Sequence, residues 1–278
     1  MKKHPPYHLR VNKAVDRFLL IEALRRLSGL IDLSKYTYYG FGGPFLEDCR
    51  LLHEYFPELS LVSIENDNET YKRQLFHRFC TDIAIKNIAF RDFLRDLKSD
   101  GKEILWLDYT DMSWERVREF LDLLDIANKG TIVKVTVRAD RRDNPYNRNT
   151  THKDIHNKVE KFRSKITEEF GAVCPAVILD DDLRPGNLPV LFQKMFQIAA
   201  EKALPAGTHC VFQPLDSVHY TDGTMMLSIT GIVWPLSEVQ LLKDRLATWR
   251  FANVSWARPR RIDVPILSLK ERLFLEKH

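Results

Sequence analysis

The sequence predicts a doubly wound α/β fold, with a mostly parallel sheet of seven strands, an antiparallel final hairpin and helices on both faces. Three observations predict this fold. Five short apolar segments alternate with segments whose apolar residues recur at helical spacing. None of the five alternates polar and apolar residues over any length, which is typical of strands buried on both faces. Two later strand-like segments are joined by an Asp-Gly pair, a strong hairpin signal.

The first half of the chain alternates the expected helices and strands. Asn12 is placed to cap a first helix and Gly29 to end it, so residues 1–30 read as a helical extension. The strands that follow are expected at 36–39, 61–64, 83–90, 104–107 and 130–137, and the helices between them at 45–56, 68–79 and 113–125.

The second half is expected to add an insertion, a final hairpin and a helical tail to the sheet. Residues 138–206 read as an insertion, with helices at 153–170 and 189–203 and a strand-like run at 174–179. Residues 209–215 and 224–233 form the hairpin, and 236–278 form a helical tail. Since no repeat, low-complexity tract or flexible linker is visible, we expect one domain over 1–278.

Composition excludes several classes of protein. A chain of 278 residues that is 44% hydrophobic is neither disordered nor a disulfide-stapled mini-fold. The net charge of +4 is compatible with a nucleic-acid partner but does not demand one. The four cysteines form no C-x-x-C pair, and no signal peptide or membrane-spanning run is visible. We therefore expect a cytoplasmic protein without a membrane partner.

Ligands of open parallel sheets bind at the carboxyl ends of the strands, so the residues there carry the functional prediction. The first strand ends in Gly40, Phe41, Gly42 and Gly43, where the backbone can turn sharply and approach a ligand closely. The cluster could equally be a tight strand-to-helix turn without a ligand.

Acidic residues end the next strands. Glu65 follows the second strand, where a carboxylate can accept hydrogen bonds from both ribose hydroxyls of an adenosine, although a helix cap or a solvated loop is the alternative. Asp92 and Phe93 follow the third strand and could contact adenine. Asp108 ends the fourth, facing whatever lies beyond the nucleoside.

These strand ends together resemble the class I S-adenosylmethionine-dependent methyltransferases, over roughly residues 36–233. The resemblance implies a Rossmann-like methyltransferase sheet with S-adenosylmethionine as cofactor. It implies that the glycine run wraps the methionine part, that Glu65, beside Asn66, binds ribose, that Asp92 and Phe93 bind adenine, and that Asp108 faces the methyl group. More narrowly, the runs 10–17, 40–48 and 264–272 resemble a bacterial group of O-methyltransferases.

Methyl transfer requires alignment and, for a hydroxyl acceptor, removal of a proton. We expect Asp108 to orient or deprotonate the acceptor, with Tyr109 and Asp111 as further candidates. A basic cluster at the chain start could hold an anionic acceptor or be solvated; it consists of Arg10, Asn12, Lys13 and Arg17. No second ligand for a metal beside Asp108 stands at a recognisable spacing, so no metal is expected.

Other functions stay open at this point. The cofactor site could belong to a non-catalytic sensor or scaffold, or to a nicotinamide-dependent oxidoreductase. A nucleic-acid methyltransferase is a further alternative, although the run Asp108-Tyr-Thr-Asp111 lacks the Pro-Pro motif of the amino-methyltransferases it would resemble. Trp249 and Trp256 beside Arg258 could stack on bases or dock the tail. The acceptor is unidentified, and a homodimer is possible.

Overall fold

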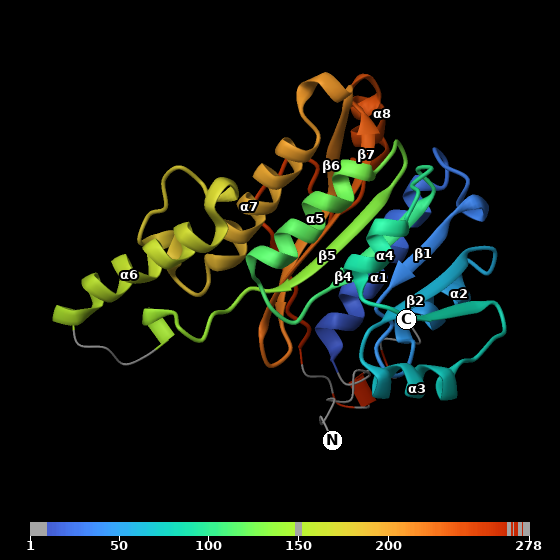
Figure 1. Cartoon of the computed structure of the whole chain (residues 1–278), viewed down its shortest axis with the longest axis horizontal. Helices are drawn as coiled ribbons and strands as arrows, with labels where there is room; N and C mark the ends of the chain where they lie inside the picture. Colours follow the sequence, from blue (N-terminus) through green and yellow to red (C-terminus); the bar gives the residue numbers. More distant parts are fainter. Residues whose placement is uncertain (1–9, 148–151, 266–267, 269, 272–273, 275–278) are drawn as a thin grey trace.

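The computed structural model describes residues 10–147, 152–265, 268, 270–271 and 274. One sheet of eight strands forms its centre, in the order β3-β2-β1-β4-β5-β7-β6-β8 (Figure 1). The first five strands are parallel, β7 runs antiparallel to β5 and β6, and β8 is parallel to β6. The strands are β1 Thr37–Gly40, β2 Ser60–Glu65, β3 Ile83–Asn87, β4 Glu103–Asp108, β5 Ile132–Arg138, β6 Cys210–Thr221, β7 Met225–Pro235 and β8 Arg260–Arg261. The predicted fold is confirmed.

The eighth strand is the one that the sequence did not predict. It spans only two residues, which pair with Val218 and His219 of β6 at the edge of the sheet. A segment this short has no periodicity to detect, and it lies between Pro259 and Ile262.

Helices cover both faces of the sheet (Figure 1). Residues of α1, α2 and α8 share one buried apolar cluster, and residues of α4, α5 and α7 share the other. The remaining helices are α3, which contacts β2 and β3, and α6, which projects away from the sheet while its buried residues join the cluster of α4, α5 and α7. The helices are α1 Val11–Leu27, α2 Glu47–Tyr55, α3 Asn68–His77, α4 Phe90–Asp96, α5 Trp114–Ile126, α6 His152–Phe170, α7 Leu188–Ala203 and α8 Val239–Leu246. Short 3-10 turns lie at Leu33–Lys35, Pro145–Asn147, Gly171–Val173, Asp181–Leu183, Ala206–Thr208 and Leu236–Glu238.

Strand β4 shows why the strands lack polar alternation. Successive side chains point to opposite faces, so Ile104 and Trp106 enter one core while Leu105 and Leu107 enter the other. All four are at most 2% exposed. A strand covered on both sides therefore favours apolar residues at successive positions.

The first helix differs from its prediction at its start. Helix α1 begins at Val11, so Asn12 lies inside it and does not cap it. The Asn12 amide instead donates to the Thr221 carbonyl (3.1 Å) and accepts from the Val264 backbone N–H (2.9 Å). Asn12 thus joins the chain start, the β6–β7 turn and the tail, three segments remote in sequence.

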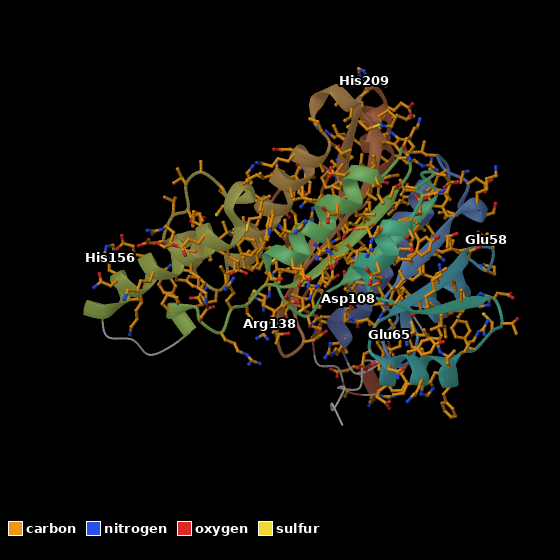
Figure 2. All side chains as sticks on the ribbon, in the orientation of Figure 1. Glu58, Glu65, Asp108, Arg138, His156 and His209 are labelled. Atoms are coloured by element: carbon orange, nitrogen blue, oxygen red, sulfur yellow. The ribbon has the colours of Figure 1, made fainter. Side chains whose placement is uncertain are left out.

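The segment between β5 and β6 contains two different kinds of helix. Helix α7 packs against α5, β6 and β7, while α6 extends outward, where Figure 2 labels His156. The expected strand at 174–179 is wrong, since these described residues form turns and irregular chain that lead to Asp181–Leu183.

The tail packs on the domain. Trp249 is 6% exposed, and the Trp256 ring lies 6.0 Å from that of Phe212. Of the two roles considered for these residues, the contacts match docking of the tail. The helix expected towards residue 278 lies largely outside the described residues. No helix within the described ranges combines the length and apolar content needed to cross a membrane.

Candidate functional site

A cavity of about 650 Å³ opens at the carboxyl ends of β1, β2 and β4. The strand order reverses between β1 and β4, which is where open α/β sheets bind ligands. Glu65 and Asp108 lie at this end of the sheet, whereas Glu58 lies beyond the opposite end of β2 (Figure 2). The predicted site residues that line the cavity are Arg10, Lys13, Arg17, Phe41, Gly42, Gly43, Glu65, Asn66, Asp92, Asp108, Tyr109 and Asp111.

Three predicted residues do not line the cavity. Gly40 packs over Tyr38, whose hydroxyl would lie 2.2 Å from a Cβ at that position. Phe93 lies in the core with its ring 5.0 Å from that of Tyr39, because it sits one residue beyond Asp92 on α4 and faces the sheet. Asn12 serves the chain junction described above. In place of Phe93, Phe90 from the same helix lines the cavity.

The glycine turn is held in a fixed shape. Gly42 and Gly43 have φ values of 61° and 55°, the left-handed region that favours glycine. The buried Gln74 amide donates to the carbonyls of Phe41 (3.0 Å) and Gly43 (2.9 Å), and Ser63 donates to its oxygen (3.0 Å). Sequence reasoning missed Gln74, since nothing local distinguishes it from an exposed helical glutamine.

Ion pairs occupy the start of α2. The Arg17 guanidinium contacts Asp48 (2.5 Å) and Glu47 (2.9 Å), both in the first turn of that helix. Although burial opposes it, these carboxylates raise the pKa of Arg17. Arg17 therefore stays protonated, and its positive charge is balanced by Glu47 and Asp48 within the protein.

The second strand end presents a carboxylate beside a capped helix. Glu65 is half-buried and accepts a hydrogen bond from the Asp67 backbone N–H (2.8 Å). Asp67 in turn caps α3 by accepting from the Thr70 backbone N–H (3.0 Å). The cap role considered for Glu65 thus belongs to Asp67, and Glu65 lines the cavity.

Asp108 is held by a lysine from the chain start. The Lys13 ammonium donates to Asp108 Oδ1 (2.9 Å) and lies 4.5 Å from the centre of the Trp106 ring. Lys13 is only 4% exposed, so this pair is shielded from water on the lysine side. Ninety-five positions separate the two residues in the sequence, and no local pattern could have paired them.

A buried ionic network lies behind this pair. Lys13 also contacts Asp16 (3.5 Å), which pairs with Lys134 at 2.7 Å and accepts from the Tyr220 hydroxyl at 3.1 Å. Burial raises the pKa of Asp16, but Lys134 and Lys13 outweigh it, and the net shift is downward. Burial and the neighbouring Asp16 carboxylate raise the pKa of Tyr220 well above its usual value. The network anchors α1 to β5 and β6.

Tyr109 and Asp111, which follow β4, form the part of the cavity wall beside α5. Arg116 donates to Asp111 (3.1 Å) and Glu119 (3.3 Å), and its guanidinium lies over the Tyr109 ring. Burial, with Glu119 beside it, raises the pKa of Tyr109 well above its usual value. Tyr109 therefore stays a neutral phenol at physiological pH. Within the described ranges, no group of three or more His, Cys, Asp or Glu side chains is placed to hold a metal ion.

Comparison with known proteins gives one family and several similar structures. The profile of the family described as "Putative O-methyltransferase" matches residues 5–278. No curated protein matches the chain in sequence.

The similar solved structures have low identity to this chain. A "probable spermidine synthase" from Corynebacterium glutamicum ATCC 13032 is 13% identical, with 91% of this chain and 81% of that chain covered and a TM-score of 0.44. A "putative caffeoyl-CoA O-methyltransferase" from Staphylococcus aureus is 10% identical, with 77% and 83% covered and a TM-score of 0.38. A mutant of MtNAS in complex with S-adenosylmethionine is 11% identical, with 79% and 63% covered and a TM-score of 0.37.

Proposed function

Since this chain belongs to the family described as "Putative O-methyltransferase", we propose that its strand-end cavity binds S-adenosylmethionine and presents the methyl group to an acceptor hydroxyl. Membership of the family confirms the predicted class of enzyme, a methyltransferase, and S-adenosylmethionine as its methyl donor. One observation supports the location of the site above all. Glu65 at the end of β2 and Asp108 at the end of β4 line the same cavity, with the glycine turn of β1 between them.

The cofactor would lie along these strand ends. Glu65 would accept hydrogen bonds from the ribose hydroxyls, with Asn66 beside it. Asp92 would accept from the adenine amino group, and Phe90 would supply the aromatic contact. The half-buried Gly43 leaves room for the methionine part, because a Cβ there would have no protein atom within 4 Å.

Asp108 would remove the acceptor proton. Lys13 engages Oδ1, which leaves Oδ2 to accept the proton of the hydroxyl that attacks. S-adenosylmethionine supplies a methyl group on a sulfonium, and the carbon–sulfur bond breaks with its electron pair going to sulfur as the oxygen–carbon bond forms. Tyr109 stays a neutral phenol, because burial and Glu119 raise its pKa, and so would not act as the base.

Calorimetric titration with S-adenosylmethionine and S-adenosylhomocysteine tests the proposal. Wild-type protein should bind both, and Glu65→Ala should bind about 30-fold more weakly, since hydrogen bonds to a charged group are lost. Glu58→Ala removes an exposed carboxylate at the other end of β2 and should bind like wild type. Equal affinity in Glu65→Ala and wild type would contradict the placement of the ribose.

We further propose one methyltransferase domain over 1–278 that acts in the bacterial cytoplasm. The four cysteines are free, which suits a reducing compartment. A homodimer is a further proposal, and light scattering on the purified protein tests it directly.

A further inference from the structure

The buried face of α1 changes character along the helix. From Leu19 to Leu27 its buried residues are apolar, whereas the stretch before Leu19 buries Asn12, Lys13 and Asp16. Lys13 lines the strand-end cavity, so the polar part of this face lies at the cavity. Asn12 joins the chain start to the β6–β7 turn and the tail, which leaves the two charged residues to be explained.

The Lys13 ammonium is held at a defined point. It contacts Asp108 Oδ1 at 2.9 Å and Asp16 Oδ2 at 3.5 Å, and it lies 4.5 Å from the centre of the Trp106 ring. The Trp106 indole N–H donates to the Thr136 hydroxyl (3.0 Å), which fixes the ring. The Lys13 side chain is 5% exposed and that of Asp108 is 29% exposed. The lysine therefore binds Asp108 from the protein side and leaves the carboxylate open to the cavity.

Asp16 is itself fixed by groups from two strands. Lys134 on β5 pairs with its Oδ1 at 2.7 Å, and the Tyr220 hydroxyl on β6 donates to its Oδ2 at 3.1 Å. The Lys134 ammonium also lies against Trp106, 5.1 Å from the ring centre. Two ammonium groups thus share one ring, with the Asp16 carboxylate in contact with both. Without this negative charge, repulsion between the two cations would drive Lys13 from its place.

Stability alone does not explain these buried charges. Asp16 and Lys134 are fully buried, and Lys13 is 4% exposed. The attraction between buried charges only partly offsets the free energy lost when they leave water, and apolar residues of similar volume are often at least as stable. Further along, α1 buries such residues at Leu20 and Leu24. The charges occur where they reach Asp108, which indicates a role in the site.

Resting on the proposed function, we infer that Asp16 is a positioning residue for methyl transfer. Its carboxylate holds the Lys13 ammonium on Oδ1 of Asp108, and this contact leaves Oδ2 for the acceptor hydroxyl. The proton of that hydroxyl passes to Oδ2 as its oxygen bonds to the methyl carbon. Arg17 pairs with the carboxylates of α2 and is not free to replace Lys13.

Substitution of Asp16 in two backgrounds tests this inference. Transfer from trideuteromethyl S-adenosylmethionine into a bacterial metabolite extract is measured by mass spectrometry. Rates are divided by the fraction of the protein that binds S-adenosylmethionine in calorimetry. Asp16→Asn should lower the rate at saturating extract at least about tenfold, because a displaced base loses most of its effect. The extract concentration at half-saturation should change less than about twofold.

A background without the base separates positioning from a structural role. Since Asp16 acts through Asp108, Asp16→Asn should cause no further loss in protein that already carries Asp108→Asn. A residue that only supports the fold would lower both rates alike, and that result would overturn the inference. Asp216→Asn is the matched control and should keep the wild-type rate. It removes another fully buried carboxylate near Lys134, one that forms no ion pair with Lys13 within the described residues.

Tyr220→Phe tests the same link without removal of a charge. It deletes the hydroxyl that donates to Asp16 and keeps the ring, so the rate at saturating extract should fall about threefold. The affinity for S-adenosylmethionine should be unchanged. If Asp16→Asn does not fold, this variant and its combination with Asp108→Asn decide the question. An unchanged rate in Tyr220→Phe would then speak against Asp16 as a positioning residue.

A crystal structure of Asp16→Asn separates this inference from the proposed function. The Lys13 ammonium should lie more than about 4 Å from Asp108, beyond the reach of an ion pair, against 2.9 Å in the wild type. An unmoved Lys13 would overturn the inference whether or not the protein transfers methyl groups. No label from wild-type protein that binds S-adenosylmethionine would overturn the transfer activity. The structure would still decide whether Asp16 holds Lys13 on Asp108.

Discussion

At the scale of single residues, one glycine of the β1 turn is needed for packing and the next for ligand binding. Gly42 and Gly43 share a left-handed backbone, but their surroundings differ. A Cβ at Gly42 would lie 2.4 Å from the Ser63 hydroxyl and against Gln74, inside the protein. A Cβ at Gly43 would meet no protein atom within 4 Å and would enter the cavity. The two glycines are therefore required for different reasons.

Alanine at each position should give different losses. Both substitutions cost about 1 kcal/mol of backbone strain, and Gly42→Ala adds the clash with Ser63, so it should have the lower free energy of unfolding. Gly43→Ala should keep most of its stability but bind S-adenosylmethionine at least about tenfold more weakly, since its Cβ occupies ligand space. Urea unfolding and calorimetry measure the two effects. Equal stability of the two variants would refute this distinction.

At the scale of elements, helix α1 depends on a residue that is remote from it in the sequence. Asp222, in the turn between β6 and β7, accepts from the Lys13 backbone N–H (2.8 Å) and from the Asn12 side chain (3.0 Å). It thereby caps the start of α1 in place of a local residue. Because Lys13 holds Asp108, the cap fixes a side chain of the site as well as a helix end.

Removal of this cap should loosen the first turn of α1. Asp222→Ala should lower the free energy of unfolding by about 1 kcal/mol, the usual value of a helix cap. It should also speed hydrogen exchange at residues 11–14 relative to the rest of the helix. Asp82→Ala removes an exposed carboxylate before β3 and is the control. Unchanged exchange at the start of α1 in Asp222→Ala would show that the cap is not required.

At the scale of the whole molecule, buried charges join both halves of the chain. Asp16 from α1, Lys134 from β5 and Asp216 from β6 are each fully buried where the parallel sheet meets the hairpin. Burial raises the pKa of Asp216 to about 6, while the lysines lower that of Asp16. The two carboxylates therefore affect stability in opposite directions as the pH changes.

The direction in which Asp216 changes stability with pH follows from its proton binding. Between the ordinary value of 3.8 and about 6, folded Asp216 holds a proton that the unfolded chain releases, so its contribution to stability falls as the pH rises. Asp216→Asn removes this dependence. Its gain in unfolding free energy over wild type should be larger at pH 8 than at pH 4 by about 2 kcal/mol.

Asp16→Asn should show the reverse sign. Its pKa is lowered on folding, so the stability it contributes is present above 3.8 and is lost as the pH falls through its folded value. The loss caused by Asp16→Asn should therefore be greater at pH 8 than at acidic pH. Urea unfolding of both variants across this range checks the pair, and parallel pH curves for the two would contradict the assignment.

The strand ends could be predicted from the sequence because apolar runs, glycines and acids are local signals. Glu65 and Asp108 were found in this way, and both line the cavity. Lys13 with Asp108, and Asp222 with α1, could not be predicted, since each pair joins residues about 100 to 200 positions apart. Phe93 was assigned to adenine from its place beside Asp92, but α4 begins at Phe90 and its helical turn directs Phe93 into the core.

The most direct test of the central claim is a crystal structure of the protein with S-adenosylhomocysteine. The ribose hydroxyls should lie within hydrogen-bond distance of the Glu65 carboxylate, with the sulfur near Gly43 and directed towards Asp108. The adenine should lie by Asp92 and Phe90. A ligand bound elsewhere, or bound in the cavity with its ribose away from Glu65, would contradict this account of the site.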